Sequence, residues 1–177
     1  MAVVALSGCQ SSGAAGSTGA SGAGVSASEL RAYVQQVEAV RLPVNDLLEG
    51  ADPILDAYHD KTITPAVAST RMSALEQRFA GYLLTVEAIA PTNKVLATLH
   101  APYAHTYIFE DNYLSALASD LAEGDFDHLP DTQNAQLLAI IEWRTQLELL
   151  ARRTGVGLPP DIQQAGRGEI APAPAGS

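Results

Sequence analysis

The spacing of apolar residues between positions 68 and 89 constrains the fold of this chain more than any other feature. Seven apolar side chains recur there in steps of three and four residues, which places them on one face of an α-helix. They are Ala68, Met72, Leu75, Phe79, Tyr82, Val86 and Ile89. Thr64 can cap the first turn, Pro65 fits the first helical position, and Pro91 stops the helix. The pattern therefore predicts a packed helix that begins at Pro65 and ends before Pro91.

A helix is also predicted before this one, from Ser26 or Ser28. Ser26 and Glu29 have the spacing of a capping box, and Pro43 should kink the helix because it has no backbone N–H. The inner side is predicted to carry Leu30, Val34, Val37, Val44 and Leu48. Asp52 and Pro53 either start a short separate helix or mark a second kink in a continuing one.

Two further helices are predicted, from about residue 92 to 123 and from about residue 131 to 153. Pro102 should bend the first of them, and Arg152 and Arg153 in the last turn of the second suit the helix dipole. The predicted inner residues are Val95, Leu99, Tyr103, Tyr107, Leu114, Leu117 and Leu121, then Leu137, Ile140, Ile141, Trp143, Leu147 and Leu150. Short connections favour antiparallel neighbours. The fold class predicted is all-α, an up-down antiparallel four-helix bundle with kinked first and third helices.

The glycines divide the chain into a body and two ends. Of 14 glycines, only Gly50, Gly81 and Gly124 lie between Val25 and Thr154. Residues 10–27 form a Gly/Ser/Ala tract without charge, which predicts a flexible tether with a mean reach of about 25 Å. Residues 155–177 are rich in Gly and Pro, so a mostly irregular tail is predicted there.

The only cysteine, Cys9, excludes an internal disulfide and a cysteine-cluster metal site. The motif Leu6-Ser7-Gly8-Cys9 resembles the lipobox of bacterial lipoproteins. The resemblance implies that the Cys9 sulfur carries a diacylglyceryl group and that the chain is cut before Cys9. Uncharacterised lipoproteins of this kind often have an Ala-rich helical domain, which the layout of this chain resembles. The implied location is the extracytoplasmic side of the cell membrane.

The leader before Cys9 is shorter than a secretory signal, which has a basic region and an apolar run of about 7–15 residues. Either the true leader extends upstream of Met1, or the motif opens a cytosolic protein by chance. On the lipoprotein reading, residues 1–8 are the remnant of a signal peptide and residues 9–27 are the lipidated cysteine and its tether. The helical bundle then spans residues 28–154 and the tail spans residues 155–177.

The charge of the chain excludes some partners. With 10 basic and 20 acidic residues the formal charge is −10, and a nucleic-acid surface needs clustered Lys and Arg. The longest apolar runs are far shorter than the roughly 20 residues of a membrane-spanning helix. We therefore expect no nucleic-acid partner, and contact with the membrane only through lipid on Cys9.

The best candidate site lies on the third predicted helix. His100, Tyr103, Tyr107 and Asp111 share one face of it, with Glu110 at the edge. With carboxylates such as Glu38, Glu76 or Glu87 from neighbouring helices, His100, Glu110 and Asp111 could hold a metal ion, as bundle cores sometimes do. The alternative, which the residue types favour, is a core histidine and two tyrosines that satisfy one another beside Pro102.

The remaining motifs do not define a reaction. The chain has no Gly-x-Ser-x-Gly elbow, no Gly-Lys phosphate loop and no repeated Glu-x-x-His pair. Residues 166–172 place one Arg and one Glu among glycines, which indicates either a docking peptide or, as we expect, a solvated tail. The sequence thus predicts a non-enzymatic binding or interaction protein without a cofactor, with a cell-envelope protein as a potential partner. The alternative is a metal-binding or redox bundle around His100.

Overall fold

The computed structural model describes residues 24–166 and 168–174, in which all regular structure is helical. Six helices follow one another: α1 (Ala27–Leu48), α2 (Asp52–His59), α3 (Pro65–Glu87), α4 (Lys94–Glu123), α5 (Gln133–Thr154) and the four-residue α6 (Pro160–Gln163). The predicted all-α fold class is confirmed. Cys9, the predicted signal remnant and most of the predicted tether lie outside the described residues.

The helix ends follow the capping signals of the sequence. Ser26 and Glu29 form the predicted capping box, in which Ser26 Oγ accepts from the Glu29 N–H at 3.2 Å and the Ser26 N–H donates to the Glu29 carboxylate at 2.7 Å. Thr64 caps α3 by accepting from the Val67 N–H, with Pro65 in the first position. The third predicted helix begins at Lys94 rather than near residue 92, because Asn93 caps it through the Val95 N–H.

The chain between α1 and α2 makes a tight turn around Gly50. The N–H groups of Gly50 and Ala51 donate to the carbonyls of Leu47 and Leu48, three residues back. A Cβ at position 50 would lie only 2.9 Å from the Leu47 carbonyl oxygen, so only glycine fits without a shift of the backbone. This turn decides the alternative that the sequence left open, and Asp52 starts a separate helix.

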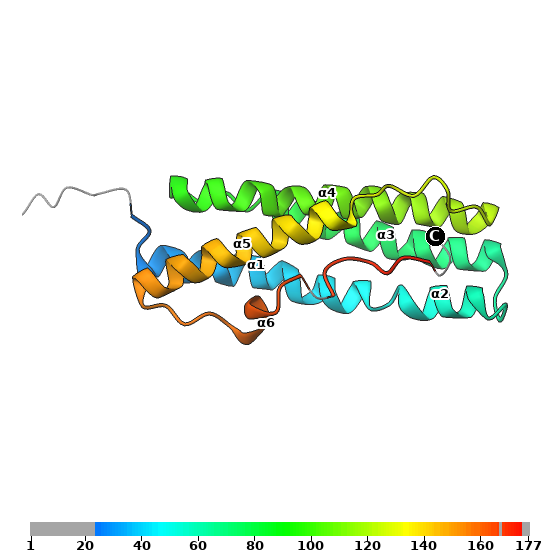
Figure 1. Ribbon diagram of the computed structural model, residues 1–177, viewed down its shortest axis with the longest axis horizontal. Helices are drawn as coiled ribbons and strands as arrows, with labels where there is room; N and C mark the ends of the chain where they lie inside the picture. Colours follow the sequence, from blue (N-terminus) through cyan, green and yellow to red (C-terminus); the bar gives the residue numbers. More distant parts are fainter. Residues whose placement is uncertain (1–23, 167, 175–177) are drawn as a thin grey trace, which may run out of the picture.

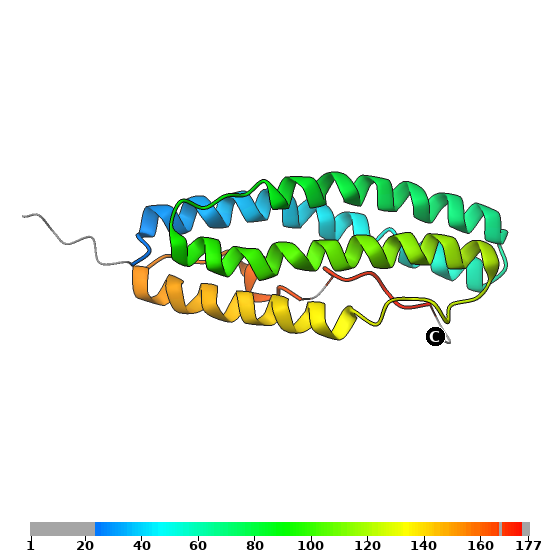
Figure 2. The same ribbon diagram turned by 90° about the horizontal axis from the view of Figure 1, so that it is seen from above.

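The four long helices lie side by side along the long axis of the molecule, and α2 continues in the direction of α1 (Figure 1). The longest of them are α4, with 30 residues, and α3, with 23, and these two pack on each other most extensively. Pro43 and Pro102 lie inside α1 and α4, which continue past them. In the second view, α5 covers only part of the length of α4, and the chain after α6 runs along the rest (Figure 2).

The core consists largely of the predicted inner side chains. All those predicted for α1 are buried, as are Met72 and Phe79 of α3 and Leu114 and Trp143 of α4 and α5. Two predictions were wrong, because Val95 is 40% exposed and Leu137 is 36% exposed. Their neighbours Leu96 and Gln136 are buried instead.

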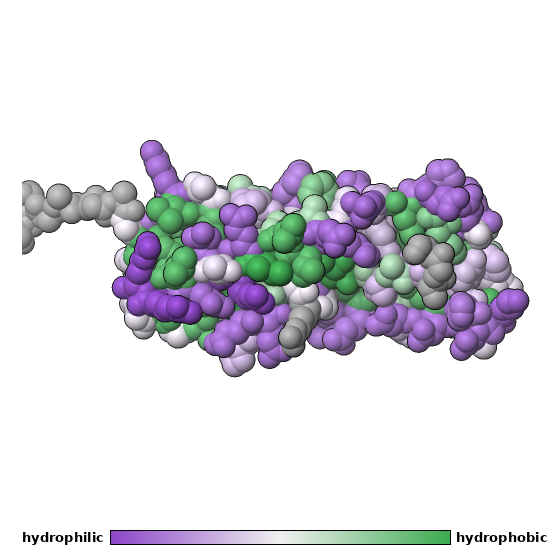
Figure 3. Space-filling model, viewed as in Figure 1, coloured by the Kyte–Doolittle hydropathy of each residue, from purple (hydrophilic) through white to green (hydrophobic). Residues whose placement is uncertain are grey.

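The described helices include none with both the length and the hydropathy that crossing a bilayer requires. Figure 3 shows that hydrophobic side chains gather over the middle of the viewed face and over the end where α1 begins, among many hydrophilic ones. Leu84 on α3 and Leu138 on α5 are the most exposed large apolar residues of the described chain, each at 68%. The surface is therefore mixed rather than uniformly polar.

The tail is irregular, as predicted, but its described part is not a solvated chain. Residues 168–174, here called the C-terminal strap, lie against the helices, with Glu169 and Ala171 buried. The Gln133 side chain donates to the Ala171 carbonyl at 3.0 Å, and the Tyr113 hydroxyl donates to the Pro172 carbonyl at 3.1 Å. The expectation of a solvated segment at 166–172 was wrong because these residues find polar and apolar partners on α4 and α5.

Candidate functional site

His100 lies at the centre of a chain of buried hydrogen bonds. Its Nε2 is 3.0 Å from the Val86 carbonyl oxygen, which can only accept, so this nitrogen carries the proton. Nδ1 then accepts from the Tyr33 hydroxyl at 3.2 Å, and that hydroxyl accepts from Trp143 Nε1 at 2.8 Å. Burial lowers the pKa of His100. The ring is thus a neutral core histidine with both nitrogens in use.

Tyr103 and Tyr107 share the predicted face and join the same aromatic core. Their hydroxyls are 3.3 Å apart, Tyr103 stacks on Trp143 with a centroid distance of 4.2 Å, and Tyr107 stacks on Phe79 at 5.7 Å. Burial raises the pKa of both phenols. The two rings therefore remain neutral and serve the packing of α3, α4 and α5.

Asp111, predicted to share this face, and Glu110, predicted at its edge, are not brought together with His100. Glu110 is fully buried and binds α5 and the C-terminal strap, whereas Asp111 is half-buried, with its pKa raised by burial. Asp111 instead faces Glu76 of α3, whose pKa is raised by burial and by the Asp111 charge. Within residues 24–166 and 168–174, no three His, Asp, Glu or Cys side chains gather closely enough to hold a metal ion.

Sequence reasoning missed a buried polar cluster formed by Arg41, Glu110, Gln136 and Glu169. Arg41, on α1, is only 1% exposed. Its Nε lies 2.5 Å from the Glu169 carboxylate, its Nη1 lies 3.4 Å from Glu38, and its Nη2 donates to the Asp161 carbonyl. One guanidinium thus ties α1 to α6 and to the C-terminal strap.

Glu110 anchors the other side of the strap. Its Oε1 accepts from the Ala171 N–H at 2.8 Å, and its Oε2 accepts from Gln136 Nε2 at 2.9 Å. The same Gln136 nitrogen also donates to the Thr106 carbonyl. Burial raises the pKa of Glu110 to about 7, although both hydrogen bonds favour the charged form. Burial also raises the pKa of Glu169, against the opposing effect of Arg41.

The polar cluster has no room for a substrate. The cavity between Tyr107, Glu110 and Glu169 measures about 10 Å³, roughly the space of one water molecule. The cluster ties α1, α4 and α5 to the C-terminal strap through contacts within the chain.

The only hint of the cluster in the sequence is the position of Arg41. It continues the inner stripe of α1 at helical spacing between Val37 and Val44, so a charged residue stands where an apolar one is expected. Gln136 gave no signal, because its neighbour Leu137 fitted the apolar period better.

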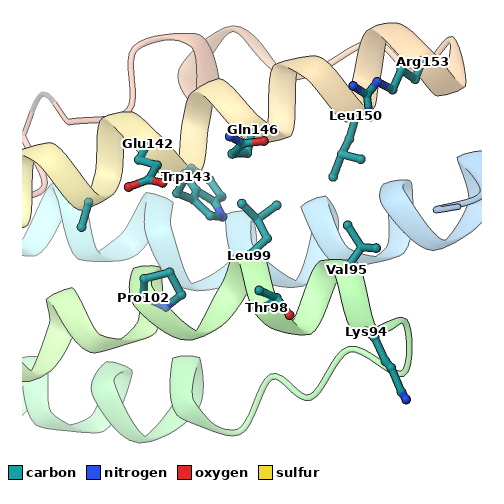
Figure 4. A pocket seen from close by; sticks show the side chains of 11 residues that line it. Lys94, Val95, Thr98, Leu99, Pro102, Glu142, Trp143, Gln146, Leu150 and Arg153 are labelled. Atoms are coloured by element: carbon teal, nitrogen blue, oxygen red, sulfur yellow. The ribbon is translucent and has the colours of Figure 1, made fainter. Parts of the chain in front are cut away.

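The candidate ligand site is a groove between α4 and α5, here called the α4–α5 groove, with a volume of about 500 Å³ (Figure 4). This is within the usual range for small-ligand sites. Leu99 and Pro102 from α4 face Trp143 and Leu150 from α5 across it. The full lining is Lys94, Val95, Thr98, Leu99, Pro102, Ala139, Glu142, Trp143, Gln146, Leu150 and Arg153.

The charges of the α4–α5 groove lie at its ends. Lys94 and Arg153 lie at one end and Glu142 lies toward the other (Figure 4). Both cations are exposed, and within the described part of the chain neither forms an ion pair. Val95, predicted to point inward, is among the lining residues, which accounts for its exposure.

Comparisons with protein-family models, curated proteins and solved structures gave no match. The described residues form an all-α fold with an open, largely apolar groove of ligand size between α4 and α5 and a C-terminal strap held by buried charged residues.

Proposed function

We propose that this chain is an exported, lipid-anchored helical protein that binds a ligand without catalysing a reaction. The observation that carries the binding role is the α4–α5 groove, which is open, largely apolar and of ligand size. Thr98 is the hydroxyl-bearing residue of the lining, and the charged residues lie at the ends of the groove, namely Lys94, Glu142 and Arg153. The lining therefore has no pair of nucleophile and base. Such a lining suits binding.

The anchor is supported by the lipobox-like motif Leu6-Ser7-Gly8-Cys9 and by the Gly/Ser tract that follows it. Two or more acyl chains on Cys9 would hold the protein stably at a bilayer, whereas one chain would give marginal binding. A flexible spacer lets an acidic body stand off the lipid headgroups. The proposed location is the extracytoplasmic face of the cell membrane, where the partners could include other envelope proteins.

The proposed architecture is an up-down antiparallel four-helix bundle, in which α1 and α2 together form one arm. It is supported by the alternating course of the four arms along the long axis in Figure 1. We propose bends at Pro43 and Pro102, because each proline leaves the carbonyl four residues back without its helical donor. Pro102 lines the α4–α5 groove.

Metabolic labelling with an alkyne fatty acid tests the anchor. The chain is expressed in a bacterium from its own upstream DNA, as wild type, as Cys9→Ser and as the matched control Ser12→Ala. Label is expected on the wild type and the control and is expected to be absent from Cys9→Ser. Label that persists in Cys9→Ser, or a wild type without label, would contradict the anchor.

A further inference from the structure

The two ends of the α4–α5 groove differ in charge, and its middle is uncharged and largely apolar. Leu99, Pro102, Trp143 and Leu150 form most of the wall between the ends, together with the uncharged polar residues Thr98 and Gln146 (Figure 4). An elongated apolar chain with a polar group at one end matches this distribution, whereas a compact polar ligand would leave the wall exposed to water.

The cationic end stands out on a chain with a formal charge of −10. Lys94 and Arg153 lie on opposite helices at this end of the groove, at the start of α4 and near the end of α5 (Figure 4). An ammonium and a guanidinium are both well suited to a carboxylate or a phosphate group. Lys94 is the first residue of α4, where a positive charge opposes the helix dipole. The helix dipole therefore does not favour a lysine at this position, and within the described residues its ammonium forms no ion pair, so it is available to an anion.

We propose that the α4–α5 groove binds a single-chain anionic amphiphile, such as a fatty acid or an anionic lysophospholipid. The acyl chain lies along Leu99, Pro102 and Trp143, and the anionic head contacts Lys94 and Arg153. This inference rests on the proposed binding function and specifies the ligand class for the same site.

The position of the cationic end suits such a ligand. The start of α4, the end of α5 and the start of α1 lie at the same end of the molecule (Figure 1). An anchor at Cys9, upstream of α1, would therefore keep the cationic end within reach of the bilayer that supplies single-chain lipids. Glu142, at the other end of the groove, would repel a headgroup and so orients the ligand.

Trp143 provides the test, because it is the only tryptophan of the chain and lines the groove. The full chain is used as Cys9→Ser, so that its own lipid plays no part, and is titrated with 9,10-dibromostearate, whose bromine atoms quench indole fluorescence at short range. Saturable quenching with one site per chain is expected. Anionic lysophosphatidylglycerol should relieve the quenching by competition, and methyl stearate should not.

Variants separate binding in the groove from general adsorption. Charge reversal by Lys94→Glu with Arg153→Glu should weaken binding by about tenfold, from the loss of two exposed ion pairs and the new repulsion. Thr98→Phe should block the groove, since Thr98 is an exposed lining residue. Arg152→Glu is the matched control, because Arg152 directly precedes Arg153 on α5, is exposed and does not line the groove. The affinity of this variant for the ligand should remain unchanged.

The proposal is overturned by an absence of saturable quenching, or by equal affinity of the charge-reversed variant and the wild type. Equal loss of affinity in Arg152→Glu would also overturn it, because a general charge effect would then explain the binding. These outcomes are distinct from a failure of the anchor, which the labelling of Cys9 reports separately.

Discussion

The charged residues of the polar cluster are buried and paired, whereas those of the α4–α5 groove are exposed and unpaired within the described residues. In the cluster, Arg41 and Glu169 are withdrawn from water and paired, because the C-terminal strap covers them. In the groove, Lys94 and Arg153 remain exposed beside an apolar wall. The comparison shows that the chain neutralises its buried charges with its own residues, whereas the charges at the groove are left in contact with water.

The largest expected effect is loss of stability when the cluster is broken. Glu169→Ala leaves the buried Arg41 guanidinium with only Glu38 and a carbonyl, so the free energy of unfolding should fall by about 3 kcal/mol in urea titrations. Replacing both partners, as Arg41→Met with Glu169→Leu, should recover most of that loss. The control Glu148→Ala breaks the exposed pair with Arg152 and should cost less than about 1 kcal/mol. If Glu169→Ala also lowered the free energy of unfolding by less than about 1 kcal/mol, the strap would contribute little to stability.

The second prediction concerns pH. Because burial raises the pKa of Glu110 from 4.5 to about 7, the folded chain binds more protons than the unfolded chain between these values. The stabilising contribution is complete below pH 4.5 and is lost as the pH rises through 7. The free energy of unfolding should decrease by about 2–3 kcal/mol between pH 5 and pH 8, and Glu110→Gln should remove this decrease. The control Glu123→Gln, at an exposed carboxylate, should retain the full pH dependence of the free energy of unfolding. If both variants showed the same pH dependence, it would arise from groups other than Glu110.

The third prediction concerns the hydrogen bonds that run behind the groove wall. Tyr33→Phe removes the hydroxyl that accepts from Trp143 and donates to His100, which leaves two buried nitrogens without partners. A loss of about 2 kcal/mol in the free energy of unfolding is expected. The matched change Tyr82→Phe, at a half-buried tyrosine, should cost far less. If both variants lost the same amount of stability, the buried hydrogen bonds of the Tyr33 hydroxyl would contribute no more to the free energy of unfolding than the half-buried Tyr82 hydroxyl does.

The smallest expected effect is on the groove itself. Lys94→Glu with Arg153→Glu should change the free energy of unfolding by less than about 0.5 kcal/mol, because the gain at the start of α4 and the loss at the end of α5 offset each other against the helix dipoles. Urea titration beside the quenching assay checks this. A large loss of stability would show that these cations serve the fold.

The helices could be predicted from the sequence because their signals are local. The three-four spacing of α3, its Thr64 cap and the capping box at Ser26 each involve residues within a few positions of one another. The Gly50 turn needed the structure, since the close approach of the Leu47 carbonyl depends on backbone geometry. The polar cluster could not be predicted, because its partners lie on four separate segments and spacing carries no information on pairing at that distance.

The candidate site was predicted in part. His100, Tyr103 and Tyr107 share a face as their spacing indicates, but hydrogen bonds to Val86 and Tyr33 give the ring a packing role. The groove was not predicted, because the apolar period of α4 assigned Val95 to the core and not to the surface. Its wall combines side chains of α4 and α5, so it depends on how the two helices pack together, and neither helix alone carries a signal of that packing.

The pairing of α1 with the end of the chain also orders the assembly of the protein during synthesis. Arg41 and its partner at Asp161 are 120 positions apart, and translation at about 5–20 residues per second separates their appearance by about 6–24 s. Through that interval the nascent chain holds a guanidinium without its partners on α6 and the C-terminal strap. The five helices α1 to α5 are therefore synthesised before the contacts of Arg41 with Asp161 and Glu169 can form.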